Sequence, residues 1–194
     1  MNTPAHLVVN LALLGGGSRR DAAGAIALGA LLPDLPMFAF FAWETLVRAT
    51  PQRAIWDERY FDPGWQAAFD LFNSIPLFGV GLAAALWRRS RVLAALCASV
   101  LLHCLLDLPF HREDGHRHLF PLSDWRFMSP VSYWDPAHGG ALGAGLEGVF
   151  VVAAACVLWR RHPRVGVRTA LALLAAFTVS AWVLFYGLGR LPDV

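Results

Sequence analysis

The stretch TALALLAAFTVSAWVLFYGL, residues 169–188, contains no charged side chain. A helix needs roughly 20 apolar residues to cross the hydrocarbon core of a bilayer. Four further stretches approach this length and composition, at residues 22–47, 69–87, 92–110 and 141–159. Residues 4–14 are also apolar but too short to span, and they end at a turn sequence, Gly15-Gly16-Gly17-Ser18. The sequence predicts an all-α, polytopic membrane helix bundle of about five transmembrane helices with a short N-terminal half-helix, residues 1–194 forming a single integral membrane domain.

The composition supports this prediction and excludes several classes of protein. Hydrophobic residues make up 57% of the 194 residues and charged residues only 15%, against about 25% charged in a typical soluble domain. A net charge of +2 gives no reason to expect nucleic acid as a partner. The three cysteines lie in apolar stretches without metal-finger spacing, which favours buried thiols. Nothing in the sequence indicates the oligomeric state.

Arginine placement predicts the orientation in the membrane. The short connections between spans are basic, and they contain Arg19 and Arg20, then Arg88, Arg89 and Arg91, then Arg160, Arg161, Arg164 and Arg168. If the helices alternate in direction, all these connections lie on one side, which the positive-inside rule makes cytoplasmic. The longer connections, 48–68 and 111–140, then face outward and carry aromatic residues typical of a membrane interface.

Four acidic residues lie within different predicted spans, namely Asp34, Asp70, Asp107 and Glu147. An ionised Asp near mid-membrane costs about 2.5 to 3.5 kcal/mol, so these groups must be protonated, hydrated or bound to a cation. We expect Glu44, by contrast, to lie at the outer end of its span within reach of water. A rise of about 1.5 Å per residue places the four acids in one slab in the outer half of the bilayer, together with His103 and Asn73. His6 joins them if residues 4–14 pack back from the glycine turn.

Local spacing supports a cation site. His103 and Asp107 are four residues apart and share one helical face, an arrangement that can give a metal two ligands. Pro33 and Pro36 must interrupt their helix, and we expect the break to direct Asp34 into the bundle. Asp70 and Asn73 share a face in the same way.

Further histidines flank the third and fourth spans. His111, His116 and His118 follow the third span, and His138 precedes the fourth. Imidazole with carboxylate is typical of zinc ligation and also suits manganese or iron, so one or two divalent metals are expected. An acid that is not a ligand, such as Asp70 or Glu147, is a candidate general base. Each feature alone also has a structural interpretation: an intramembrane Asp can bond a neighbouring helix, an HxxxD pair can be a structural hydrogen bond, and loop histidines can simply be solvated.

Three motifs resemble one family. Thr3-Pro4-Ala5-His6, the run GALLPD at 29–34 and the run LHCLLD at 102–107 resemble the bacterial inner-membrane metal-dependent hydrolases described as LexA-binding and inner-membrane-associated. The run PLSDWRFMSPVSYWD at 121–135 looks like a subgroup sometimes labelled cobalamin biosynthesis proteins. The order of a His, a Pro-Asp and an HxxxD is also similar to zinc-dependent phospholipase C.

The resemblance implies a bacterial inner-membrane location and a set of ligands. His6, Asp34, His103 and Asp107 would bind the metal, with His118 and His138 as further ligands. Asp70, Asn73 and Glu147 would complete the site or move protons. The chain departs from the pattern at Phe72-Asn73-Ser74, where many relatives have Thr-His-Ser. It also lacks the late HxxxE of the phospholipases, because His138 and Glu147 are nine residues apart.

These observations predict a membrane-embedded, metal-dependent hydrolase of a lipid or lipid-linked phosphoester, with its site toward the outer face. A carrier of divalent metal or protons is the second hypothesis, and water paths from both sides would favour it. A non-catalytic membrane protein with a structural metal is the third, and a closed ligand shell would favour it.

Overall fold

The computed structural model describes residues 1–16 and 22–187, and within these ranges the chain is helical, with no strand. The predicted all-α bundle is therefore confirmed. The elements in chain order are α1 (Thr3–Leu14), α2 (Ala23–Leu31), η2 (Leu32–Asp34), α3 (Leu35–Ala42), η3 (Trp43–Val47), α4 (Gln52–Asp57), η4 (Arg59–Phe61), α5 (Pro63–Phe72), α6 (Ile75–Trp87), α7 (Arg91–Asp107), η5 (Pro136–His138), α8 (Gly140–Arg161), α9 (Val165–Trp182) and η6 (Val183–Gly187).

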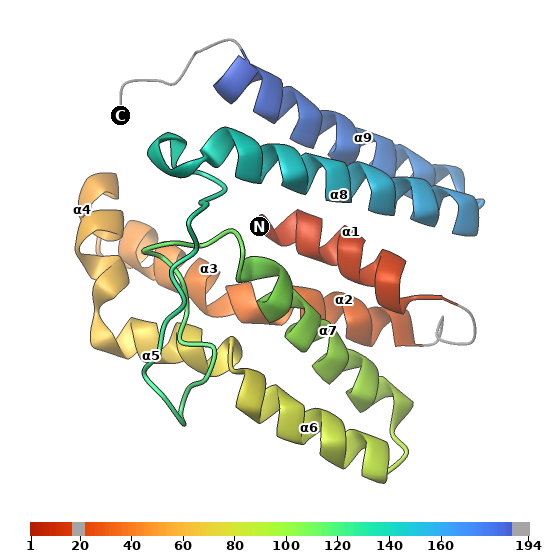
Figure 1. Cartoon of the computed structure of the whole chain (residues 1–194), viewed down its shortest axis with the longest axis horizontal. Helices are drawn as coiled ribbons and strands as arrows, with labels where there is room; N and C mark the ends of the chain where they lie inside the picture. Colours follow the sequence, from red (N-terminus) through yellow and green to blue (C-terminus); the bar gives the residue numbers. More distant parts are fainter. Residues whose placement is uncertain (17–21, 188–194) are drawn as a thin grey trace.

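The helices form a bundle around α1 and α7. α8 and α9 make an antiparallel pair on one side, and α6 and α7 make another on the opposite side (Figure 1). α1 lies between these pairs, in contact with α8, α2 and α7. The N-terminus consequently lies inside the molecule rather than at an end of it (Figure 1). This arrangement brings the first residues of the chain against the middle of the bundle.

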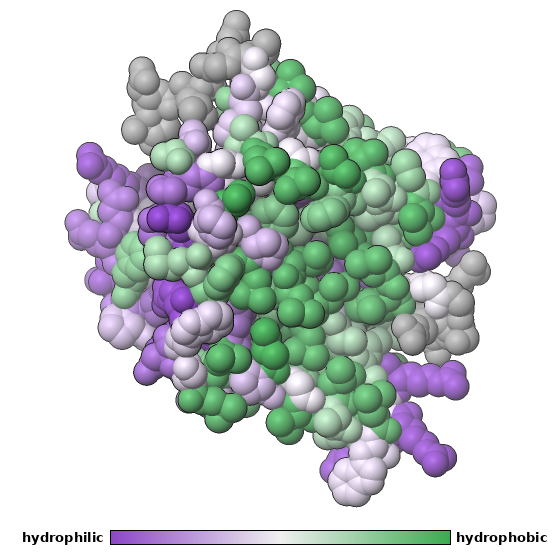
Figure 2. All heavy atoms as spheres, viewed as in Figure 1, coloured by the Kyte–Doolittle hydropathy of each residue, from purple (hydrophilic) through white to green (hydrophobic). Residues whose placement is uncertain are grey.

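Within the described residues, four helical stretches are long and apolar enough to cross a membrane: Ala23–Val47, Pro63–Trp87, Gly140–Arg161 and Val165–Gly187. These fit a membrane protein. The remaining predicted span, 92–110, forms α7, which at 17 residues is shorter than these four stretches. α1 is the expected short N-terminal helix. Figure 2 shows a broad hydrophobic area across the middle of one face, with hydrophilic residues gathered at both ends, as a bilayer-embedded bundle requires.

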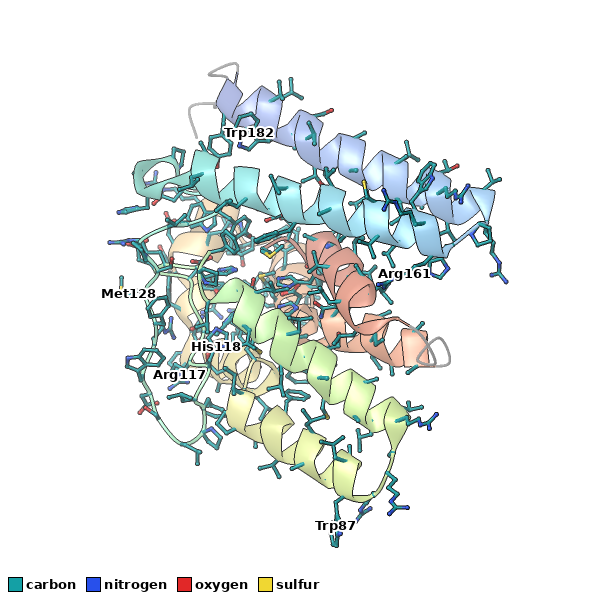
Figure 3. The ribbon with its side chains drawn as sticks, turned by 45° about the vertical axis from the view of Figure 1, so that its right-hand side comes forward. Trp87, Arg117, His118, Met128, Arg161 and Trp182 are labelled. Atoms are coloured by element: carbon teal, nitrogen blue, oxygen red, sulfur yellow. The ribbon has the colours of Figure 1, made fainter. Side chains whose placement is uncertain are left out.

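The connections sort to the two ends as the arginine pattern predicts. The turn between α6 and α7 and the turn between α8 and α9 lie at one end of the bundle (Figure 1). Trp87 and Arg161 lie toward this end, while Arg117 and His118 lie in the long loop that covers the other (Figure 3). We call the end with the two short turns the basic end and the end covered by the long loop the loop end. Arg19, Arg20 and the Gly17-Ser18 part of the predicted turn lie outside the described residues.

Small residues let the central helices approach closely. A Cβ at Gly29 of α2 would lie 2.4 Å from the backbone oxygen of Leu96 and 2.8 Å from the Cβ of Ser99, both on α7. The Ser99 hydroxyl bonds the Ile26 carbonyl at 2.7 Å, and the Asn10 amide from α1 bonds the Ser99 hydroxyl at 2.8 Å. Buried polar contacts thus join α1, α2 and α7 one helical turn away from His6 and His103.

Glu44 does not reach water as expected. Its side chain is fully buried at the loop end, where it accepts a hydrogen bond from the Thr50 hydroxyl at 2.7 Å and lies 3.5 Å from the Arg59 guanidinium. The π-helical turn η3 is followed by a short loop that folds back over this carboxylate. An ion pair therefore compensates a charge that was expected to be solvated.

Candidate metal site

One face of α7 carries the polar residues of the bundle centre. Ser99, His103 and Asp107 are spaced by four residues and are all buried, because residues at this spacing line one side of a helix. His6 and Asn10 of α1 have the same spacing and face them. Two helices far apart in sequence thus bring a matched set of polar side chains together.

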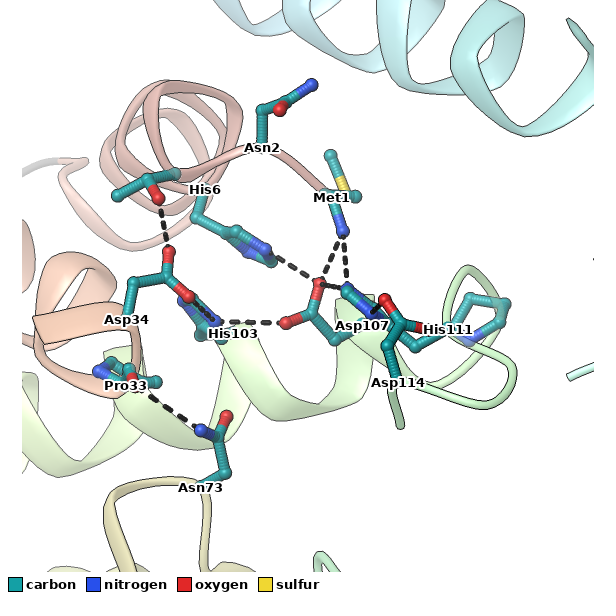
Figure 4. Close-up of polar contacts among 12 residues, drawn as sticks. Met1, Asn2, His6, Pro33, Asp34, Asn73, His103, Asp107, His111 and Asp114 are labelled. Atoms are coloured by element: carbon teal, nitrogen blue, oxygen red, sulfur yellow. Dashed lines mark hydrogen bonds and ion pairs between the residues drawn. The ribbon is translucent and has the colours of Figure 1, made fainter. Parts of the chain in front are cut away.

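The Asp107 carboxylate contacts two imidazoles, one through each of its oxygens (Figure 4). The Nε2 atom of His6 is 2.8 Å from Asp107 Oδ1, and the Nε2 atom of His103 is 3.0 Å from Asp107 Oδ2. The two rings stack with centroids 3.6 Å apart and an interplanar angle of 14°. His6, His103 and Asp107 can each present one ligand atom within 4.8 Å of the others. The geometry therefore allows all three to hold one ion.

The surroundings of His103 decide how its ring can be protonated. Its Nδ1 atom is 2.8 Å from the carbonyl oxygen of Ala30, so Nδ1 carries a proton and donates. Its Nε2 atom is buried and forms no hydrogen bond to any residue that the structure describes. A neutral ring would point this lone pair at the Asp107 carboxylate, which is repulsive. A proton or a metal ion at Nε2 removes the repulsion, and backbone anchoring of the other nitrogen is the usual support of a metal-binding histidine.

Asp34 lies at the edge of this group, at the helix break that its prolines predict. The 3₁₀ turn η2 separates α2 from α3 there. The Thr3 hydroxyl donates to Asp34 Oδ2 at 2.5 Å, and Asp34 Oδ1 is 3.6 Å from His103 Nε2. The break also leaves the Pro33 carbonyl to accept from the Asn73 amide at 3.3 Å. The four residues predicted as ligands, His6, Asp34, His103 and Asp107, therefore lie close together.

His111, whose role the sequence left open, also reaches the site. Its Nε2 is 3.4 Å from Asp107 Oδ1, and its Nδ1 is 2.7 Å from Asp114 Oδ2. Burial by itself lowers the pKa of His111, but the Asp107 and Asp114 carboxylates outweigh it and raise the pKa to about 9. The same contact brings the pKa of Asp114 down to about 2, against the opposing effect of burial. Asp107 and His111 are four residues apart, as His103 and Asp107 are, and this repeated spacing could have indicated the contact from the sequence.

Other contacts surround the same carboxylate. The amino group of Met1 lies 2.6 Å from Asp107 Oδ1 and 3.2 Å from His111 Nε2 (Figure 4). Asn2 donates to Glu147 of α8 from its backbone nitrogen at 3.2 Å and from its amide at 2.8 Å. Glu147 is therefore hydrogen-bonded to the residue that follows Met1, through both the backbone nitrogen and the side-chain amide of Asn2.

Asp70, one of the four intramembrane acids, pairs with an arginine of the long loop. Asp70 accepts from Arg117, at 2.8 Å from the backbone nitrogen and at 2.5 Å from the guanidinium Nε. This contact raises the pKa of Arg117. A loop arginine rather than a metal therefore neutralises Asp70, and the catalytic roles predicted for Asp70 and Glu147 gain no geometric support.

His118 and His138 are engaged elsewhere. His118 Nδ1 is 3.1 Å from the carbonyl oxygen of Asn73, and burial lowers the pKa of His118. His138, in η5, pairs with Asp135 at 2.5 Å and is partly exposed. Neither belongs to the three-residue group, so their role as ligands stays a prediction.

Comparisons with protein-family models, curated proteins and solved structures find no match to this chain. The family resemblance drawn from the three sequence motifs therefore stays a prediction. His6, His103 and Asp107 together form what we call the metal group.

Proposed function

We propose that this membrane protein binds a divalent metal ion through the metal group and hydrolyses a phosphoester in a lipid or lipid-linked substrate. The observation that carries the proposal is the buried His103 Nε2, which lies 3.0 Å from an Asp107 oxygen and forms no hydrogen bond within the described residues, while Nδ1 is anchored to a carbonyl. Zinc is the first choice, with manganese and iron as alternatives, because two imidazoles and a carboxylate suit all three.

The ligand set supports a catalytic rather than a saturated site. Two histidines and one carboxylate are a frequent set of three protein ligands at catalytic zinc, where the fourth position is left for water. When bound, such an ion acts as a Lewis acid and makes the water more acidic. Asp34, held by Thr3 at 2.5 Å and 3.6 Å from His103, is placed to accept a proton or to become a fourth ligand.

The location within the bundle supports an amphiphilic substrate. His103 and Asp107 lie near the loop-end terminus of α7, at a level where the neighbouring helices are apolar. A phosphoester attached to a lipid can present its headgroup at this depth. We place the protein in the bacterial inner membrane with this end outward, because the arginines gather at the other end.

One observation favours a non-catalytic alternative, a membrane protein with a structural metal. His6 and His103 have no solvent exposure, and Asp107 is 3% exposed. A substrate can reach such a group only if the loop over the loop end, or α1, moves aside. A carrier of metal or protons stays a further prediction.

The test is metal content in the detergent-purified chain. We expect about one metal ion per wild-type chain and near-zero metal in His103→Ala. His138→Ala is the matched control, because that histidine pairs with Asp135, and it should keep the metal. Size-exclusion profiles establish that each variant is folded. Near-zero metal in the wild type, after growth and purification with zinc, manganese and iron in turn, would contradict the proposal.

Activity is a separate measurement. Metal-loaded wild type should release phosphate-containing product from a panel of phospholipids and polyprenyl phosphates, and His103→Ala should not. Metal binding without turnover of any substrate in the panel would favour the structural-metal alternative.

A further inference from the structure

A groove of about 510 Å³ lies at the basic end, away from the metal group. Residues of α2, α6 and α7 line it together with Leu14 at the end of α1, and none of the metal group residues does. Much of the lining consists of small side chains, namely Ala22, Ala85, Ala94, Ala95 and Ala98. Its polar lining residues all lie at the turn between α6 and α7, at one end of the groove, and they are Arg89, Ser90 and Arg91. We call this end the mouth. The groove is thus apolar along its length and cationic at one end.

The backbone at Arg89 is unusual for an arginine. Its φ is +56°, in the left-handed region. Ser90 N bonds the Ala85 carbonyl at 2.8 Å and Arg89 N bonds the Leu86 carbonyl at 3.0 Å, so the turn is a Schellman cap. Glycine is the residue that such a cap favours, because a side chain here is strained. An arginine kept at a strained position suggests a function for its side chain.

The charge at the mouth is not neutralised by the protein that the structure describes. In residues 1–16 and 22–187, no ion pair includes Arg89 or Arg91, and both side chains are exposed. Ser90 caps the N-terminus of α7 by accepting from Leu93 N at 3.4 Å, and the first backbone N–H groups of α7 lie at the same place. Two guanidiniums beside a helix N-terminus attract an anion.

We propose that this groove binds an anionic glycerophospholipid of the leaflet at the basic end. One acyl chain lies along the alanine-lined wall, and the phosphate lies between Arg89 and Arg91 at the α7 N-terminus. A soluble anion would leave the apolar groove unfilled, and an uncharged lipid would leave the arginines unpaired. The lipid site is independent of the metal group, and its test needs no metal.

The experiment is native mass spectrometry of the detergent-purified full chain. The probes are dioleoylphosphatidylglycerol, dioleoylphosphatidylcholine with the same acyl chains, and inorganic phosphate. We expect phosphatidylglycerol to bind most tightly and inorganic phosphate not to bind measurably. Arg89→Gln and Arg91→Gln should each weaken phosphatidylglycerol binding about fivefold, since a basic residue near an anionic lipid surface contributes about that factor.

Two controls separate this site from general attraction to a basic surface. Arg88 is exposed, lies in the same turn and does not line the groove, so Arg88→Gln should change binding less than twofold. Ala95→Leu fills the groove without changing charge and should weaken binding of both lipids. Arg89→Gly should match Arg89→Gln in binding but unfold at or above the wild-type temperature, because the backbone strain is relieved.

The proposal is overturned if Arg88→Gln weakens binding as much as Arg89→Gln, or if Ala95→Leu leaves phosphatidylglycerol binding unchanged. Equal binding of the two lipids by the wild type would also overturn it. Tight binding of inorganic phosphate would show a plain anion site instead. Each outcome is readable whether or not the chain binds metal or has hydrolase activity.

Discussion

His103 has its two ring nitrogens in opposite surroundings. Nδ1 donates to a backbone carbonyl, whereas Nε2 lies 3.0 Å from an Asp107 oxygen and forms no hydrogen bond within the part of the chain that the structure describes. A buried polar atom without a partner costs free energy on the order of 1–3 kcal/mol, and more near a charge. A cation bound at Nε2 would remove this cost and would also neutralise the adjacent Asp107 carboxylate. For this reason the functional proposal depends on the surroundings of this one nitrogen.

His116 allows a prediction at the same scale. It lies in the loop near His111 and His118, with ring centroids 6.2 and 6.0 Å away. Burial, reinforced by these two imidazoles, lowers the pKa of His116 from 6.5 to about 3. The folded state therefore disfavours the protonated ring, and the stability that His116 contributes is present above pH 6.5 and lost as the pH falls toward 3.

We expect the unfolding temperature to fall between pH 7.5 and pH 5, with His116 contributing at most about 2 kcal/mol of lost stability at pH 5. His116→Gln, which cannot be protonated, should show a shallower decline when thermal unfolding is followed in detergent. An identical pH dependence in wild type and variant would mean that His116 stays hydrated and titrates normally in the folded chain.

At the scale of elements, the interrupted helices position the site. The break at η2 presents Asp34 and frees carbonyl groups, and the break between α5 and α6 exposes the Asn73 carbonyl that His118 contacts. Both breaks contain prolines at helix starts, where the missing N–H costs nothing. Unwound backbone at membrane depth is tolerated because neighbouring helices satisfy it.

The packing of α2 on α7 leads to a second prediction. A Cβ at Gly29 would meet the Leu96 backbone oxygen at 2.4 Å, so Gly29→Ala should force the helices apart and destabilise the fold by about 1–3 kcal/mol. Gly24→Ala in the same helix is the matched control, because no atom of the described residues lies within 4 Å of its Cβ. That variant should be neutral or up to about 1 kcal/mol more stable.

Thermal unfolding of the two variants checks this comparison, at about 2–4 °C for each kcal/mol in a chain of this size. Gly29→Ala should also lower metal content, since the Ala30 carbonyl that orients His103 moves with α2. Equal unfolding temperatures for Gly24→Ala and Gly29→Ala would show that α2 and α7 are further apart than the structure places them.

At the scale of the whole molecule, charge and hydropathy divide the bundle into a basic end, an apolar middle and a loop end (Figure 2). Short basic connections stay in the cytoplasm because translocating arginine is costly. The metal group lies nearer the loop end and the lipid groove nearer the basic end. The two proposed sites therefore serve opposite leaflets.

This arrangement predicts the membrane topology. In a Cys156→Ser background, a membrane-impermeant maleimide added from outside should label Leu122→Cys in the exposed loop. Val165→Cys, in the α8–α9 connection, should be labelled only after the membrane is permeabilised. Both native positions are more than three-quarters exposed, at 79% and 78%, so access to the reagent is limited by the membrane alone. The reverse pattern would place the arginines outside.

Several features could be read from the sequence because they depend on local rules. Span length, the apolar composition of 169–188 and the arginine-rich turns follow from hydropathy and charge alone. The pairing of His103 with Asp107 follows from a spacing of four, and the break at Asp34 follows from its flanking prolines. Even the approach of His6 followed from the short helix folding back from its turn.

Only the tertiary structure decided which of the buried polar groups belong together. Asp70 lies at a comparable depth to Asp107, but the loop brings Arg117 to it, and no local pattern indicates a pairing across 47 positions. His111 contacts Asp107 whereas His138 pairs with Asp135, since the direction of a loop depends on what it packs against. Sequence periodicity determines which face a side chain takes, whereas its partner depends on the packing of distant helices and loops.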